Sequence, residues 1–372
     1  MTYLRAVEVS GSASVVEGPL QGHHHETYVF PLPGEAGEAS QVRWKCREPR
    51  SNLLWFDRRC FASEEELLTV LQGRIGGIPD IIQAGTVLLQ RFIEGETLGW
   101  HCRAGRVISP SALGQIVELF RQLVQITPGT LPVRRTCAPE DRAMDGDTSG
   151  FLERLIHFTE QRVYGANLEH FEDLFSALGV DGDSFKRLRK HVSGLSERPF
   201  CFLYADLHRE NFIIDREGRL WTIDWELAML GDPLYDLATH LYLMRYPKHQ
   251  ERRMAELWCE VVEGVRPGSS AGWREDLPKL LDYKRAQSVF TDVIRVSLSL
   301  SPPPAPPERL EPVETGQEPN PIRLSQAGRK VRNVLTAAAD PLGLERVPTL
   351  RRIKGALAQW YREREPGMKH AR

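Results

Sequence analysis

A change of pattern near residue 95 constrains the fold most strongly. Before it, short β-rich runs alternate with turn residues, at 15–22, 27–32, 41–46 and 86–93. A single helix is predicted from Ser63, because Ser63 and Glu66 have the spacing of a capping box and Leu67, Leu68 and Leu71 share one face. Residues 1–95 should therefore form a small antiparallel β-sheet with one helix.

From about residue 111 the apolar residues recur at helical spacing, with only two short β-rich interruptions, at 200–204 and 220–223. This predicts an α+β chain whose larger part, 96–300, is mostly helical. A proline-rich connection at 301–321 and a basic helical tail at 322–372 should follow.

Composition narrows the function classes. The formal net charge of −2 argues against a nucleic-acid partner, and no apolar run is long enough to cross a membrane. The first residues lack a secretory pattern, and the six cysteines are scattered, which predicts reduced thiols in a cytoplasmic protein.

Charge is unevenly distributed along the chain. The tail carries 12 Lys or Arg against 4 Asp or Glu, whereas the preceding 321 residues carry 36 against 46. An acidic body with a basic tail suits a cationic or neutral substrate, or docking of the tail on the body.

Two acids and an amide carry the chemical signal. Asp206 precedes Asn211 by five residues, a hairpin turn occupies 216–219, and Asp224 comes just after a predicted strand. Phosphoryl transfer from a nucleotide needs one carboxylate to orient the acceptor hydroxyl, and an amide oxygen with a second carboxylate to hold Mg²⁺.

Asp-Leu-His-x-x-Asn at 206–211, followed by Ile-Asp-Trp-Glu-x-Ala-x-x-Gly-Asp-Pro-x-x-Asp-Leu-Ala at 223–238, resembles the aminoglycoside phosphotransferase and choline kinase superfamily. The resemblance covers residues 15 to about 300 and implies a bilobal protein-kinase-like fold, with 1–95 as nucleotide-binding lobe and 96–300 as catalytic and acceptor-binding lobe. It also implies that Asp206 is the catalytic base and that Asn211 and Asp224 bind Mg²⁺.

The same resemblance assigns residues of the first lobe. Lys45 matches the strand lysine that contacts the nucleotide phosphates, with Glu64 as its ion-pair partner and Glu65 as second choice. Arg91 and Ile93 match the hinge whose backbone binds adenine. Gly22 closes the phosphate-covering loop, and His23, which follows it, could offer a donor to phosphate.

The chain departs from many relatives at 204–205, where Tyr-Ala stands in place of His-Gly. We interpret this as altered support for the loop rather than loss of catalysis. Asp232 and Asp236 resemble the structural acids beneath the loop, and His208 is interpreted as a loop-packing residue.

The leading hypothesis is an O-phosphotransferase that uses ATP or GTP with Mg²⁺. Its acceptor would be a hydroxylated small molecule, neutral or cationic, with an antibiotic of aminoglycoside or nucleoside type as the leading case. A metabolic kinase for choline, ethanolamine, homoserine or a sugar is the alternative, and a catalytically silent nucleotide-binding module is a third. A monomer and a dimer are equally compatible with the sequence.

Overall fold

The computed structural model describes residues 2–20, 25–32, 42–49, 59–300 and 318–363. Contacts group these residues into two units. Unit 1 comprises the described residues of 1–53, 57–138 and 198–271, and unit 2 mainly those of 139–197 and 272–372.

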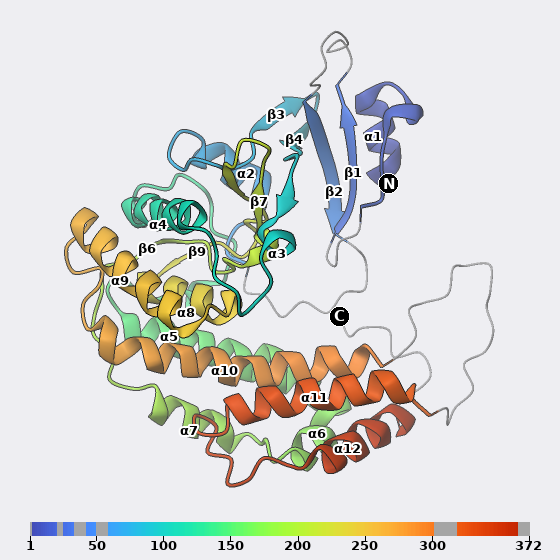
Figure 1. Cartoon of the computed structure of the whole chain (residues 1–372), viewed down its shortest axis with the longest axis vertical. Helices are drawn as coiled ribbons and strands as arrows, with labels where there is room; N and C mark the ends of the chain where they lie inside the picture. The colour runs from blue at the N-terminus through green and yellow to red at the C-terminus, as the bar shows by residue number, and fades with distance from the viewer. Residues whose placement is uncertain (1, 21–24, 33–41, 50–58, 301–317, 364–372) are drawn as a thin grey trace. The chain divides into compact units, whose positions relative to one another are not determined.

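Unit 1 contains a four-stranded antiparallel sheet in the order β1-β2-β4-β3 (Figure 1). Its strands are β1 (His25–Pro31), β2 (Arg43–Pro49), β3 (Ile81–Ala84) and β4 (Val87–Arg91). The register sets Lys45 of β2 opposite Val29 of β1 and Gln90 of β4. Phe30, Trp44 and Leu89 are buried on the core side of this sheet, so the neighbouring residues of β2 face the other side.

The helix α2 (Glu64–Leu71) begins as predicted. The Ser63 hydroxyl accepts the backbone N–H of Glu66 at 3.2 Å, and Leu67, Leu68 and Leu71 are buried. This start fixes which residues occupy the first turn of α2, and so which carboxylates face β2.

The rest of unit 1 carries the short strands and helices around the predicted catalytic segment. In chain order these are β5 (Glu96–Thr97), α3 (Leu98–His101), α4 (Pro110–Gln125), β6 (Cys201–Leu203), β7 (Phe212–Ile214), β8 (Leu220–Thr222), β9 (Met229–Gly231), α8 (Pro233–Met244) and α9 (Lys248–Val265). The hairpin predicted at 216–219 joins β7 to β8, and Asp215 accepts backbone N–H groups of Glu217 and Arg219 there.

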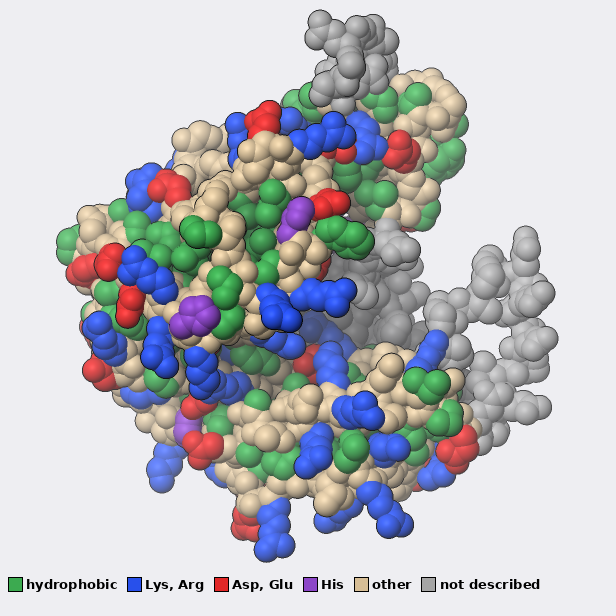
Figure 2. Space-filling view, viewed as in Figure 1, with side chains coloured by type: hydrophobic (Ala, Val, Ile, Leu, Met, Phe, Trp, Pro, Cys, Tyr) green, Lys and Arg blue, Asp and Glu red, His purple; other side chains and the backbone are tan. Residues whose placement is uncertain are grey.

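Unit 2 is helical. Its longer helices are α5 (Thr148–Phe158), α6 (Leu168–Ala177), α7 (Asp183–His191), α10 (Trp273–Leu298), α11 (Pro321–Ala337) and α12 (Leu350–Glu363). Phe185 stacks on Phe290 at 4.3 Å between ring centroids, and Phe171 stacks on Trp360 at 5.0 Å. Exposed Lys and Arg side chains are spread over the face of α10–α12 seen in Figure 2.

The predicted α+β class is confirmed, with small antiparallel sheets and a mostly helical remainder. An additional helix, α1 (Thr2–Ser10), was not predicted and packs against β1 and β2. Within 15–22, residues 21–22 lie outside the described residues, and Glu17 makes only an isolated bridge to Val29. The proline-rich segment lies outside the described residues as far as 317, and the domain boundaries at 95, 300 and 321 stay a prediction.

The six cysteines all lie among the described residues, and no disulfide joins them there. No helix in the described ranges combines the length and the apolar character that crossing a membrane would require.

An enclosed ion pair joins two segments of unit 1. Both guanidinium nitrogens of Arg198 that face Asp232 donate to its carboxylate at 2.8 Å, and the side chains are 0% and 1% exposed. Asp232 also caps α8 by accepting the Leu234 N–H at 2.9 Å. A bidentate pair removed from water leaves an uncompensated charge when either partner is lost.

We therefore expect Asp232→Asn, which keeps the shape and the capping oxygen, to lower the free energy of unfolding by about 3–5 kcal/mol. Urea denaturation measures the change. The control is Arg253→Gln, which breaks an exposed ion pair with Glu256 in the same unit and should cost less than about 1 kcal/mol. Equal effects of the two variants would contradict a structural role for the buried pair.

Candidate active site

The predicted catalytic segment is a loop between β6 and β7 that is held by one carboxylate. Asp236 of α8 accepts the backbone N–H of Tyr204 at 3.0 Å and that of Ala205 at 2.7 Å. Ala205 has a φ of 67°, a left-handed conformation that suits glycine better than alanine. The loop thus keeps the conformation expected of a glycine position, although the chain places alanine there.

Tyr204 links this loop to the segment that carries Asp224. Its hydroxyl donates to the carbonyl of Ile223, and its ring packs edge-on against that of Trp225, with 4.7 Å between the ring centroids. Burial raises the pKa of Tyr204 well above its usual value, and the charges of Asp224 and Asp206 raise it further. Hydrogen bonds thus link the segments that carry the three predicted residues: Asn211 donates to Asp206, and its backbone carbonyl accepts at 3.0 Å the N–H of Ile223, the residue before Asp224.

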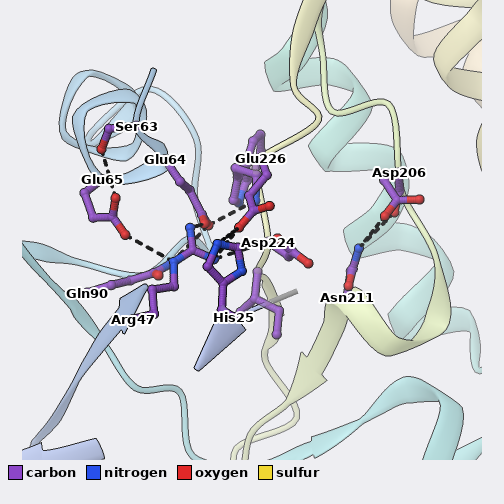
Figure 3. Close-up of polar contacts among 12 residues, drawn as sticks. His25, Arg47, Ser63, Glu64, Glu65, Gln90, Asp206, Asn211, Asp224 and Glu226 are labelled. Atoms are coloured by element: carbon purple, nitrogen blue, oxygen red, sulfur yellow. Dashed lines mark hydrogen bonds and ion pairs between the residues drawn. The ribbon is translucent and has the colours of Figure 1, made fainter. Parts of the chain in front are cut away.

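Asp206 and Asn211 point toward each other (Figure 3). The Asn211 amide nitrogen donates to the Asp206 carbonyl at 3.1 Å and to its carboxylate at 3.2 Å. Because the nitrogen is committed to Asp206, the amide oxygen is the Asn211 atom suited to a cation.

His208 contacts Asp206 directly, which the packing interpretation missed. Its Nδ1 accepts the Glu210 N–H at 3.2 Å, so a neutral ring carries its proton on Nε2, which lies 3.4 Å from the Asp206 carboxylate. Burial lowers the pKa of His208, but the hydrogen bond and charge of Asp206 outweigh burial and raise it.

Two buried side chains, those of His240 and Arg209, hold the loop through contacts with backbone carbonyls, and neither was predicted. His240 contacts the Leu207 carbonyl at 3.1 Å through Nδ1, and burial lowers its pKa to about 3, so it stays neutral. The Arg209 guanidinium donates to the carbonyls of Met244, Cys102 and Arg106. No sequence pattern singles out these contacts, since they depend on which carbonyls the fold leaves unpaired.

Asp224 has a φ of 64° and a side chain that is 50% exposed. Its carboxylate, with those of Glu64 and Glu226, supplies oxygens that lie within 4.8 Å of one another. A set of carboxylate oxygens with one accessible member fits a hard divalent cation such as Mg²⁺. Glu64 and Glu226 are paired with cationic side chains, so Asp224 is the member of this cluster left to hold a cation. Asn211 is not a member of this cluster, and its role as a second ligand stays a prediction.

The predicted ion pair between Lys45 and Glu64 is wrong. Glu64 pairs with Arg47, whose guanidinium also lies 2.9 Å from Glu226 and 3.2 Å from Glu65 (Figure 3). Lys45 and Arg47 are two residues apart in β2, so both side chains lie on the same face of the sheet. The longer, forked side chain of Arg47 forms the ion pairs with the carboxylates there. The alternation along β2 could have identified Arg47 as a second candidate.

Lys45 is half-buried on that face. Burial and the neighbouring Arg47 lower its pKa to about 8, against the opposing charge of Asp224. Among the described residues, Lys45 has no hydrogen-bond or ion-pair partner.

The predicted hinge residues lie at the end of β4. Arg91 donates its N–H to the Asp80 carbonyl and pairs with the Asp80 carboxylate at 3.0 Å. Ile93 belongs to a small apolar cluster with Ile213 and Trp221. Gly22 and His23 lie outside the described residues.

The sequence of this region matches a known family. The model of the phosphotransferase enzyme family matches residues 62–275, more than half of the chain, so the chain belongs to that family. The match spans α2, the loop with Asp206 and Asn211 and the segment after Asp224, and the expectation of a small-molecule kinase is confirmed.

Solved structures are similar at low identity. A choline/ethanolamine kinase family protein from Mesorhizobium loti is 15% identical, with 96% of this chain and 100% of that chain covered and a TM-score of 0.47. The choline kinase LicA from Streptococcus pneumoniae is 17% identical, with 90% and 98% covered and a TM-score of 0.47. The macrolide 2′-phosphotransferase MphH from Brachybacterium faecium is 13% identical, with 78% and 91% covered and a TM-score of 0.43.

The left-handed backbone at Ala205 yields a stability prediction. Ala205→Gly should raise the free energy of unfolding by about 0.5–1 kcal/mol, because the relief of roughly 1–2 kcal/mol of backbone strain exceeds glycine's extra entropy in the unfolded chain. Urea denaturation checks this. The control is Ala255→Gly in the interior of α9, where glycine should destabilise by about 1 kcal/mol. A loss of stability in both variants would contradict strain at Ala205.

Proposed function

We propose that this chain transfers the γ-phosphoryl group of ATP or GTP to a hydroxyl group of a small molecule. The observation that supports the proposal is the set of hydrogen bonds that joins Asp206 to Asn211, and both Asn211 and Tyr204 to Ile223, the residue before Asp224. These groups supply one carboxylate for an acceptor and oxygens for a cation, the two requirements of this chemistry.

Asp206 is the proposed catalytic base. It would accept a hydrogen bond from the acceptor hydroxyl and take its proton as the oxygen bonds to the γ-phosphorus and the bond to the bridging oxygen of the leaving diphosphate breaks. Asn211 and the Nε2 of His208 would orient the Asp206 carboxylate for this proton transfer. Mg²⁺ bound by Asn211 and Asp224 would neutralise charge that develops on the phosphate oxygens.

The nucleotide base has a proposed place at the end of β4. Residues 1–95 are proposed as the nucleotide-binding part of the chain, with the backbone of Arg91 and Ile93 contacting adenine. Ile223, which is partly buried and packs on the buried cluster of Ile93, Ile213 and Trp221, would offer apolar surface to a base. Gly22 and His23 stay proposed as contacts to phosphate.

For the acceptor, we propose an antibiotic of aminoglycoside or nucleoside type. The acidic surplus of the first 321 residues supports a cationic or neutral acceptor. A panel that contains aminoglycosides, nucleoside antibiotics, choline, ethanolamine, homoserine and sugars, incubated with radiolabelled ATP, tests this choice. Transfer to choline or another metabolite alone would replace the antibiotic proposal with the metabolic one.

Replacement of the base separates chemistry from binding. Asp206→Asn should lower turnover by about 10²- to 10⁴-fold, because the amide cannot accept the proton. Nucleotide affinity, measured by calorimetry with Mg²⁺, should stay within about threefold of the wild type. The control is Glu217→Gln in the exposed β7–β8 turn, which should retain full turnover. Wild-type turnover in Asp206→Asn would refute the role of Asp206.

Replacement of Asp224 tests the metal site. Wild-type protein should gain thermal stability with ATP and Mg²⁺, and much less with ATP and a chelator, because binding to the folded state stabilises it. Asp224→Ala should remove most of the Mg²⁺-dependent part and weaken calorimetric affinity by about tenfold or more. An equal Mg²⁺-dependent gain in Asp224→Ala would contradict its role. Binding without any hydrolysis or transfer would favour the silent module.

A further inference from the structure

Arg47 is enclosed by acidic side chains. Its guanidinium pairs with Glu64 and lies 2.9 Å from Glu226, 3.2 Å from Glu65 and 4.0 Å from Asp224. The side chain is only 11% exposed. A planar guanidinium has several donors in fixed directions, so it can serve several carboxylates at once, which an ammonium group on a flexible stem does less well.

Glu64 connects three elements. Its side chain is fully buried and accepts from Arg47 of β2, from Gln90 of β4 at 3.4 Å and from the backbone N–H of Trp225 at 3.0 Å. The last contact fixes the backbone immediately after Asp224. Arg47 and Glu64 together therefore tie α2 and β2 to the segment that carries the proposed metal ligand.

Glu226 provides a second connection to the same segment. Its buried carboxylate accepts a hydrogen bond from Arg59 and forms ion pairs with Arg47 at 2.9 Å and with His25 Nε2 at 3.0 Å. The 224–226 segment is thus held on both sides of Trp225 by carboxylates that share Arg47. Because its guanidinium already faces these carboxylates, Arg47 is not expected to bind another anion.

Lys45 differs from Arg47 because it has no acidic partner among the described residues. It lies on the same face of β2 and close enough to Asp224 to be influenced by its charge. Within the described ranges it has no hydrogen-bond or ion-pair partner. A half-buried ammonium group without a partner is unfavourable, and an anionic ligand would relieve that cost.

We propose that two residues of β2 have separate roles. Arg47, not Lys45, is the positioning residue that holds α2 and the 224–226 segment together, and Lys45 keeps only the phosphate contact that the family resemblance already implies. This inference rests on the proposed function, since it needs a nucleotide in the site. It differs from the arrangement implied by the family resemblance, in which one lysine both pairs with the helix carboxylate and contacts phosphate.

The test compares Lys45→Met with Arg47→Met. For Lys45→Met we expect a ten- to hundredfold weaker affinity for Mg·ADP by calorimetry, with the melting temperature of the nucleotide-free protein unchanged or raised. For Arg47→Met we expect a melting temperature lower by several degrees and a reduced kcat, with the nucleotide KM changed by less than about threefold. Arg5→Gln, which breaks an exposed ion pair with Glu48 of β2, is the control and should change neither quantity.

Two further variants keep the test decisive if Arg47→Met fails to fold. Arg47→Lys preserves the charge but not the fork, so it should reproduce the loss of melting temperature and of kcat. Glu226→Gln removes one of the shared carboxylates and should lower kcat more than it raises the nucleotide KM. Full rescue of both quantities by Arg47→Lys would overturn the positioning role.

The inference is overturned if Arg47→Met or Arg47→Lys weakens Mg·ADP as much as Lys45→Met does, or if Lys45→Met alone leaves the affinity unchanged. Failure of the wild-type protein to bind Mg·ADP would instead reject the proposed function. The wild-type titration therefore comes first, and the two failures are distinguished by it.

Discussion

The carboxylate of Asp236 is the constraint on which the candidate site depends. It takes the backbone N–H groups of Tyr204 and Ala205, and it is itself buried in α8. Buried hydrogen bonds to a charged acceptor are strong and directional, so they hold the backbone in a conformation that an alanine would otherwise avoid. The backbone direction at Asp206, the next residue, is therefore fixed, and it sets the direction of the residues that follow.

Other contacts fix the rest of the loop without involving the carboxylates of Asp206 and Asp224. Arg209 donates to three carbonyls, His240 contacts the Leu207 carbonyl, and Tyr204 joins the loop to Ile223. None of these contacts uses the carboxylate of Asp206 or that of Asp224. The fold directs these buried polar groups to the backbone, and the side chains of Asp206 and Asp224 stay 27% and 50% exposed.

The loop with Asp206 and Asn211 and the hairpin that follows it could be located from the sequence, because Asp206, Asn211 and Asp224 lie within one short segment; their catalytic roles stay a proposal. Helix α2 could be predicted because its capping residues, Ser63 and Glu66, are close together in the sequence. The partner of Glu64 could not, because β2 presents Lys45 and Arg47 on one face and packing decides between them. Helix α1 was missed since its buried residues, Thr2, Ala6 and Ser10, are small or polar and give little apolar periodicity.

Charge balance explains why Asp224 is left exposed while its neighbours are not. Glu64, Glu65 and Glu226 share Arg47 as an ion-pair partner, and Arg59 and His25 also pair with Glu226. Asp224 reaches Arg47 only at 4.0 Å and remains half open to solvent. A polyphosphate entering beside it would meet net repulsion, which a divalent cation between the two anions converts into attraction. The incomplete pairing of Asp224 is therefore what would make binding of a nucleotide depend on the metal, whereas complete pairing would leave the metal no ligand.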